Sequence, residues 1–202
     1  MLFTQDERST ASDAVMRAMF EARKRVFVDL LGWDVPVLAG KYEVDQFDDM
    51  HARYLILADS AQNHLASARL LPTIRPHILD TLFADLCKEV PPTGPDLYEI
   101  TRFCLDRSLR AAERRRWRDA LVTGLAHYAL EQGITTYTGV AEQGWLHQIL
   151  EFGWDAKPLG QPKTIDGMTL CALRIKITAE TPALLAANGI LPPNQILEAE
   201  AA

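Results

Sequence analysis

The stretch that decides the fold spans residues 97–140 and reads LYEITRFCLDRSLRAAERRRWRDALVTGLAHYALEQGITTYTGV. Its first part, 97–105, alternates apolar and polar residues and predicts a β-strand. Apolar side chains then recur every three to four residues over 111–131, which predicts a long helix that Gly133 ends. Residues 134–140 predict a second strand. A strand, a long helix and another strand in succession are typical of an α/β domain.

The flanking segments continue this alternation of helices and strands. Ser12 and Asp13 can cap a helix that runs to about residue 31, with Val15, Met19, Val26 and Leu30 on one face. The further expected elements are a hairpin of strands 53–59 and 64–71, helices at 78–88 and 142–152, a hairpin of 156–159 and 168–177 that turns at 166–167, and a short helix from about 181. No linker is long enough to separate two domains. We expect one α/β domain over residues 1–202, with a mixed sheet, helices on both faces and a frayed tail from about residue 190.

The composition is that of an ordinary globular protein and excludes several classes. The chain has 202 residues, of which 48% are hydrophobic and 24% charged, and a net charge of −6. Three widely spaced cysteines, in no metal-ligand pattern, exclude a disulfide scaffold and suggest a reducing compartment. No apolar run approaches the roughly 18 to 20 residues that cross a bilayer. The first residues lack the layout of a signal peptide, so we expect a cytoplasmic protein without a membrane span.

The net charge hides a strong asymmetry. Residues 102–118 contain seven arginines and two acidic residues, a net charge of +5, whereas the rest of the chain nets −11. Arg110, Arg114 and Arg118 recur at helical spacing and would form one stripe. This stripe is either a solvated helix face or a contact for an anionic partner. The acidic remainder of the chain argues against a nucleic-acid-binding protein, and we expect no nucleic-acid partner.

An acidic segment, KYEVDQFDD at 41–49, places four carboxylates close together. Only Lys41 and Arg53 are near in sequence to balance them, so we expect a segment that is neither helical nor deeply buried as a whole. It is either a solvated loop or a site for a cationic ligand, because clustered carboxylates attract positive charge. A metal is a third reading, but the segment lacks histidine, cysteine and the spacing of a calcium loop, and we expect no metal.

Glu99 and Arg102 stand three residues apart on the strand at 97–105. Such positions face opposite sides of a sheet, so both can enter one site only if the strand bulges or bends. Arg102 could be a surface ion-pair partner. A buried Glu99 beside a reacting amine could act as a general base.

Three further positions complete the candidate set. Arg69 lies mid-strand among apolar residues, where an arginine is almost always paired, and the acidic segment is the nearest source of partners. Arg23 and Phe27 are one helical turn apart, and Trp33 follows. Aromatic residues here are either core or, beside carboxylates, a contact for an ammonium or sulfonium ion.

Taken together, RKRVFVDLLGW, YEVDQFDD, ASARLLPT and YEITRF, in this order and spacing, resemble the acyl-homoserine-lactone synthases of bacterial quorum sensing. The residues that match the family pattern are Arg23, Phe27, Trp33, Glu43, Asp45, Asp48, Arg69, Glu99 and Arg102. The resemblance covers about residues 15–160. It implies a three-layer αβα fold similar to the GNAT N-acetyltransferases.

The resemblance also implies a reaction. Members transfer an acyl group from acyl-carrier protein or acyl-CoA to the amine of S-adenosylmethionine, whose carboxylate then displaces methylthioadenosine and closes a lactone. S-adenosylmethionine is then a substrate and no separate cofactor is implied. The residues assigned to it are Arg23, Phe27, Trp33, Asp45, Asp48 and Arg102, with Arg69 in support. Glu99 is the candidate base and Glu43 the alternative.

The acyl group and its donor stay open at this point. The segment 136–154 corresponds to the family's acyl pocket, with Thr138, Val140, Trp145 and Leu146 as candidates, unless these are simply core. Its departure from straight-chain synthases resembles members that use short, branched or aryl groups. Arg110, Arg114, Arg115 and Arg118 could contact donor phosphates or an acidic carrier protein. The alternative is a GNAT-like N-acyltransferase acting on another amine, but RAAERR at 110–115 lacks the glycines of that family's pyrophosphate loop.

Overall fold

The computed structural model describes residues 2–3 and 10–192, which form two compact units. Of the described residues, the first unit comprises 2–3, 10–70, 102–124 and 192, and the second comprises Leu71–Thr101 and Leu125–Leu191. The predicted tail lies outside the described residues from position 193 onward. Because strands β5 and β6 and helix α3 each contribute to both units, the chain passes between them several times. The single domain over residues 1–202 stays a prediction.

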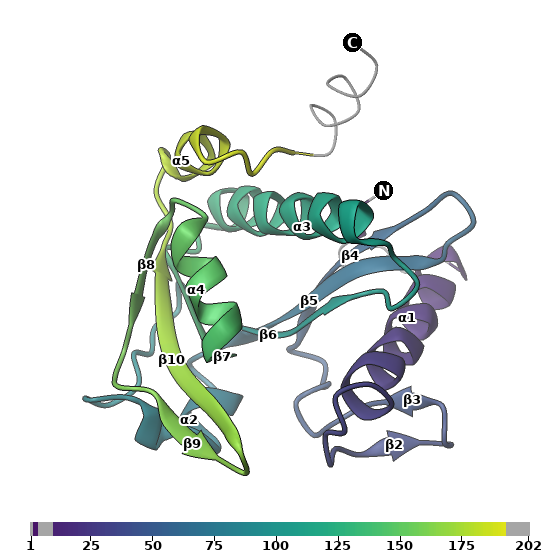
Figure 1. Ribbon diagram of the computed structural model, residues 1–202, viewed down its shortest axis with the longest axis horizontal. Helices are drawn as coiled ribbons and strands as arrows, with labels where there is room; N and C mark the ends of the chain where they lie inside the picture. Colours follow the sequence, from purple (N-terminus) through teal and green to yellow (C-terminus); the bar gives the residue numbers. More distant parts are fainter. Residues whose placement is uncertain (1, 4–9, 193–202) are drawn as a thin grey trace. The chain divides into compact units, whose positions relative to one another are not determined.

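The first unit contains a sheet with the strand order β1-β4-β5-β6 (Figure 1). The predicted hairpin is confirmed, and its antiparallel register places Tyr54 opposite Arg69. The elements of this unit are β1 (Leu2–Phe3), α1 (Thr10–Arg23), η1 (Lys24–Val28), β2 (Val37–Leu38), β3 (Tyr42–Glu43), β4 (Arg53–Ala58), and the parts of β5 (His64–Pro72), β6 (Leu97–Leu105) and α3 (Ala111–Gln132) that belong to it.

The second unit continues with the strand order β6-β7-β10-β8, and β9 pairs with β10. Strands β6 and β7 run parallel, with Glu99 opposite Thr138, whereas β7, β8 and β9 pair with β10 antiparallel. The predicted mixed sheet of an α/β protein is therefore confirmed. The elements that begin in this unit are α2 (Ile78–Thr81), η2 (Ala84–Leu86), β7 (Thr136–Glu142), α4 (Gln143–Glu151), β8 (Asp155–Pro158), β9 (Lys163–Ile165), β10 (Met168–Lys176) and α5 (Thr181–Ala187).

The tight turns and the long helix follow the sequence prediction closely. Asp166 and Gly167 have φ angles of 48° and 80°, so the turn between β9 and β10 is the one that an Asp-Gly pair favours. Gly133 ends α3 with a φ of 69°. The predicted pairing of 156–159 with 168–177 is present as β8 and β10. The turn at 166–167 instead joins β10 to β9, a short strand that follows β8 in sequence and also pairs with β10.

Two predicted helices are wrong in their extent. The helix expected to reach residue 31 ends at Arg23 and continues as a π-helix over Lys24–Val28, which is why Leu30 is exposed while Val15 and Met19 are buried. The helix expected over 78–88 divides into α2 and a 3-10 turn, because the backbone of Phe83 leaves the helical region with φ −133°.

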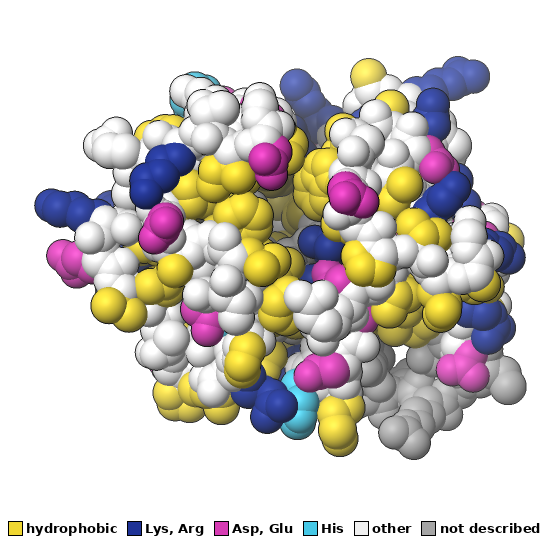
Figure 2. Space-filling model, turned by 90° about the horizontal axis from the view of Figure 1, so that it is seen from below, with side chains coloured by type: hydrophobic (Ala, Val, Ile, Leu, Met, Phe, Trp, Pro, Cys, Tyr) yellow, Lys and Arg dark blue, Asp and Glu magenta, His cyan; other side chains and the backbone are white. Residues whose placement is uncertain are grey.

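Each unit buries an apolar core. In the second unit Leu79, Leu86, Leu170 and Ala172 pack together. Figure 2 shows hydrophobic side chains interspersed with charged and polar ones on the face that it presents. Among the described residues, no helix is both long and apolar enough to cross a membrane.

Candidate functional site

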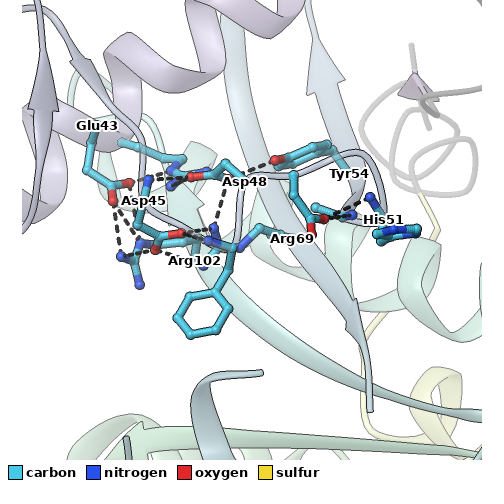
Figure 3. Close-up of polar contacts among 11 residues, drawn as sticks. Glu43, Asp45, Asp48, His51, Tyr54, Arg69 and Arg102 are labelled. Atoms are coloured by element: carbon cyan, nitrogen blue, oxygen red, sulfur yellow. Dashed lines mark hydrogen bonds and ion pairs between the residues drawn. The ribbon is translucent and has the colours of Figure 1, made fainter. Parts of the chain in front are cut away.

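Three arginines and three carboxylates from separate elements of the first unit meet in one buried cluster (Figure 3). Arg23 ends α1, Arg69 lies in β5 and Arg102 lies in β6. The carboxylates belong to Glu43, at the end of β3, and to Asp45 and Asp48 in the loop that follows. We call these six residues the arginine–carboxylate cluster.

Arg23 joins the two ends of the acidic segment. Its Nε donates to Glu43 Oε2 at 2.5 Å, and its Nη1 and Nη2 donate to the two oxygens of Asp48 at 2.8 and 2.9 Å. The side chain is 1% exposed. A two-pronged guanidinium–carboxylate contact of this kind fixes geometry as well as charge.

Arg69 holds the middle of the segment. It donates to both oxygens of Asp45 at 2.6 and 3.0 Å, and its Nη1 lies 2.8 Å from Asp48 Oδ1. Tyr54, opposite Arg69 on β4, donates its hydroxyl proton to Asp48 at 2.7 Å. Sequence reasoning missed Tyr54, although the predicted hairpin could have placed it beside Arg69.

Arg102 completes the cluster from an unusual backbone conformation. Its Nη2 donates to Glu43 at 3.0 Å and to Asp45 at 2.7 Å. It has a φ of 50°, and the burial of β6 changes phase there, since Glu99, Thr101 and Cys104 are its buried positions. This is the irregularity that a strand needs to redirect a side chain.

Phe27 and Trp33 form a stacked pair beside Arg102. Their ring centroids are 4.6 Å apart, and the Arg102 guanidinium carbon lies 5.7 and 5.6 Å from the two centroids. Phe27 is buried and Trp33 is half-buried. The cation already over these rings is therefore an arginine of the chain.

The acidic segment is neither helical nor buried as a whole, as expected, but two of its carboxylates are buried. The side chains of Glu43 and Asp48 are 0% and 1% exposed, and arginines far away in sequence balance their charges. Burial alone would raise the pKa of Asp48, but hydrogen bonds from Arg23 and the charges of Arg23 and Arg69 outweigh it and lower that pKa. Burial and the charge of Asp48 raise the pKa of Tyr54, which therefore stays protonated.

This shift predicts acid sensitivity. A carboxyl whose pKa is lower in the folded chain stabilises the fold above its ordinary value of 3.8 and loses that contribution as the pH falls below it. We expect the free energy of unfolding, measured by urea titration, to fall steeply below pH 4. Asp49→Asn, which changes an exposed carboxylate that accepts only backbone N–H groups in its turn, should keep the wild-type profile. An unfolding free energy that stays flat from pH 5 to pH 3 would contradict this prediction.

Glu99 and the predicted acyl-pocket residues lie in the second unit. Glu99 is buried on β6 and pairs in register with Thr138 on β7. Thr138 is buried, and Val140, two residues on, packs against the core of Leu79 and its neighbours. Leu146 is buried on α4, and Trp145 meets Phe152 edge to face. The strand pairing thus brings Glu99 beside one acyl-pocket candidate.

The predicted donor-binding arginines divide into two groups. Arg110 and Arg115 are exposed at the start of α3. Arg114 donates to the carbonyl of Asp106 at 3.2 Å, and Arg118 donates to Asp119 at 2.8 Å. Arg114 and Arg118 therefore already bind groups of the chain itself, whereas Arg110 and Arg115 are exposed. Over the described residues, no group of three histidine, cysteine, aspartate or glutamate side chains is arranged to hold a metal ion.

The chain is an α/β protein with a mixed sheet and a buried arginine–carboxylate cluster, and comparisons with known proteins identify its family. The model of the autoinducer synthase family matches residues 7–184, so the chain belongs to the autoinducer synthases. An acyl-homoserine-lactone synthase of Ralstonia nicotianae is 31% identical over 182 residues, which cover 88% of this chain and 89% of that protein.

Solved structures agree with this assignment. A CoA-dependent acyl-homoserine lactone synthase, BjaI, solved with SAM and isopentyl-CoA, has a TM-score of 0.80 at 25% identity and covers 88% of this chain and 83% of its own. A protein described as an N-acetyltransferase from Lactobacillus plantarum shares the fold, with a TM-score of 0.62 at 16% identity over 88% of this chain and 98% of its own. The predicted similarity to the N-acetyltransferase fold is confirmed.

Proposed function

We propose that this chain is an acyl-homoserine-lactone synthase that acylates S-adenosylmethionine and then lactonises the product. The observation that carries the proposal is the arginine–carboxylate cluster. Eight of the nine residues that match the family motif lie within it or stack on it, although they are spread over 80 positions of the chain.

In this proposal the exposure of the cluster members divides their roles. The Arg102 side chain is 9% exposed, whereas those of Arg23 and Arg69 are 1% and 0% exposed. Arg102 is therefore the arginine best able to bind the substrate carboxylate, and Arg23 and Arg69 support it. Asp45 is the more exposed of the two aspartates and would bind the ammonium group. Phe27 and Trp33 would pack against the adenosyl-sulfonium end.

The chemistry requires one proton transfer before acylation. The substrate amine has an ordinary pKa of about 8, so a carboxylate base is sufficient to remove its proton. We assign this role to Glu99. The free amine attacks the thioester carbonyl and the thiol leaves. The methionine carboxylate then attacks the γ-carbon, and the carbon–sulfur bond breaks to release methylthioadenosine. S-adenosylmethionine is a substrate here, and no step calls for a separate cofactor.

The acyl donor is a thioester, and Thr138, Val140, Trp145 and Leu146 would select its acyl group. Arg110 and Arg115, with Arg114 and Arg118 behind them, would contact the anionic part of CoA or of a carrier protein. Because S-adenosylmethionine and acyl thioesters are metabolites of the cytoplasm, we place the enzyme there.

The proposal predicts that S-adenosylmethionine and a suitable acyl thioester yield lactone, free thiol and methylthioadenosine in equal amounts. A panel of acyl-CoA and acyl-carrier-protein donors, followed by mass spectrometry, checks this and identifies the donor. Asp45→Asn should raise the KM for S-adenosylmethionine about tenfold, because a charge-assisted hydrogen bond to the ammonium is lost. Thiol release with another amine and no methylthioadenosine would instead support a GNAT-like N-acyltransferase.

A further inference from the structure

Asp106, directly after the end of β6, is a centre of contacts that the family motif does not include. Its Oδ2 accepts from Arg25 Nη2 at 2.9 Å, and its Oδ1 accepts from the backbone N–H and the hydroxyl of Ser108 at 2.9 and 2.7 Å. Its own N–H donates to the carbonyl of Leu65 at 2.9 Å. The carboxylate is therefore fixed in position between β5, the turn before α3 and the π-helix.

We propose that Asp106 and Arg25 position the π-helical segment Lys24–Val28, and with it Phe27, for the binding of S-adenosylmethionine. The inference rests on the proposed function, because it assigns Phe27 to that substrate. Neither residue is placed in contact with the reacting atoms, so both are positioning residues.

The π-helical segment needs such an anchor. Its turns close by hydrogen bonds five residues apart, from Asp29 N to Lys24 O at 3.1 Å and from Leu31 N to Val26 O at 3.0 Å. π-Helical turns are rare, appear mostly as single turns within α-helices and are frequent at functional sites. We therefore expect residues of other elements to fix the side chains of this segment.

Strand β6 and the residue that follows it contact this segment at two points. Arg102 lies over the ring of Phe27, and Asp106, four residues further on, binds Arg25. Arg25 and Phe27 are two residues apart on one helical turn, so their side chains leave it in different directions. Because Arg102 contacts Phe27 and Asp106 binds Arg25, the segment is held on two sides and cannot rotate. Phe27 therefore stays stacked on Trp33.

His64 also lies near Asp106, but it is Arg25 that balances the charge of this carboxylate. Its Nε2 lies 2.8 Å from the hydroxyl of Ser67, and its Nδ1 lies 3.9 Å from Asp106 Oδ2. Burial lowers the pKa of His64, so the ring is neutral at pH 7, whereas the nearby His64 ring and the hydrogen bonds from Ser108 and Arg25 lower the pKa of Asp106 and keep it ionised. In the part of the chain that the structure describes, the Arg25 guanidinium forms an ion pair with this carboxylate, whereas Arg114 donates to the Asp106 carbonyl.

The exposure of the pair predicts a selective effect. The Arg25 side chain is 45% exposed, and ion pairs with an exposed partner contribute little to global stability. Loss of the pair should therefore leave the protein folded and change the local geometry around Phe27. That combination separates a positioning role from a merely structural one.

The test compares Arg25→Gln, Asp106→Asn and the double variant with Lys24→Gln. Lys24 belongs to the same segment but forms its ion pair with Asp29 rather than with Asp106. It is therefore a matched control. Each single variant should raise the KM for S-adenosylmethionine about three- to tenfold and leave kcat within about twofold. The double variant should resemble the singles, and Lys24→Gln should resemble the wild type.

Hydrogen–deuterium exchange over residues 24–33 provides a readout that needs no substrate. Exchange there should accelerate in Arg25→Gln and Asp106→Asn, with exchange over 136–151 unchanged. Unchanged KM and unchanged exchange in Arg25→Gln, or additive effects in the double variant, would overturn the inference. A wild-type protein that releases no methylthioadenosine would reject the proposed function instead, and exchange alone would then decide whether Arg25 and Asp106 anchor the segment.

Discussion

Glu99→Gln is expected to lower kcat by about 10²- to 10⁴-fold, the usual contribution of a general base, while the KM for S-adenosylmethionine changes less than about twofold. The substitution keeps the shape of the side chain but removes the carboxylate that would accept the amine proton. Glu99 is fully buried, so its replacement by an isosteric amide keeps the packing of β6. Single-turnover measurement of acyl transfer, together with steady-state release of methylthioadenosine, checks both halves of the prediction.

Glu43→Gln is the matched control, because Glu43 is the alternative base. Oε1 and Oε2 of Glu43 already accept from Arg102, and Oε2 also accepts from Arg23. A carboxylate occupied by two guanidinium groups is poorly placed to take a proton from a substrate. This variant should therefore lose substrate affinity and stability rather than rate. If Glu99→Gln turned over normally and Glu43→Gln did not, the assignment of the base would be reversed.

The sequence predicts the elements well because their signals are local. Alternation over 53–59 and 64–71 gives the hairpin of β4 and β5, and the Asp-Gly pair gives the turn between β9 and β10. The candidate residues also emerge from sequence, because arginines among apolar residues and clustered carboxylates need partners. The roles of Thr138 and the other acyl-pocket residues stay predictions.

The features that the sequence does not predict depend on contacts between distant segments. The sequence pairs Arg69 with the acidic segment but does not predict that Glu43 and Asp48 are buried, because Arg23, Arg69 and Arg102 lie 20 to 59 residues from the carboxylates that they bind. The π-helix at Lys24–Val28 follows from no residue pattern. It contacts Arg102 and Asp106, which lie more than 70 positions further along the chain.

Arg69→Met is expected to have the largest effect on stability. The Arg69 side chain is 0% exposed, and its guanidinium contacts Asp45 and Asp48 and lies 5.9 Å from the ring centroid of Phe47. Methionine fills much of the space but leaves three buried carboxylates in the cluster with two arginines. Removal of one member of a buried ion pair costs about 3–5 kcal/mol, because the remaining charge is neither paired nor hydrated. Urea unfolding at pH 7 measures this loss.

Three companion variants decide whether charge or packing is responsible. Arg174→Met replaces an exposed arginine in the middle of β10 and should change the free energy of unfolding by less than about 0.5 kcal/mol. Arg69→Lys keeps the charge but loses the two-pronged contact with Asp45, so it should fall between the wild type and Arg69→Met. Asp45→Asn in the Arg69→Met background removes one of the uncompensated carboxylates and should recover part of the lost stability. If Arg69→Met were as stable as the wild type, the cluster would not depend on charge balance, and the division of roles between Arg69 and Arg102 would lose its physical basis.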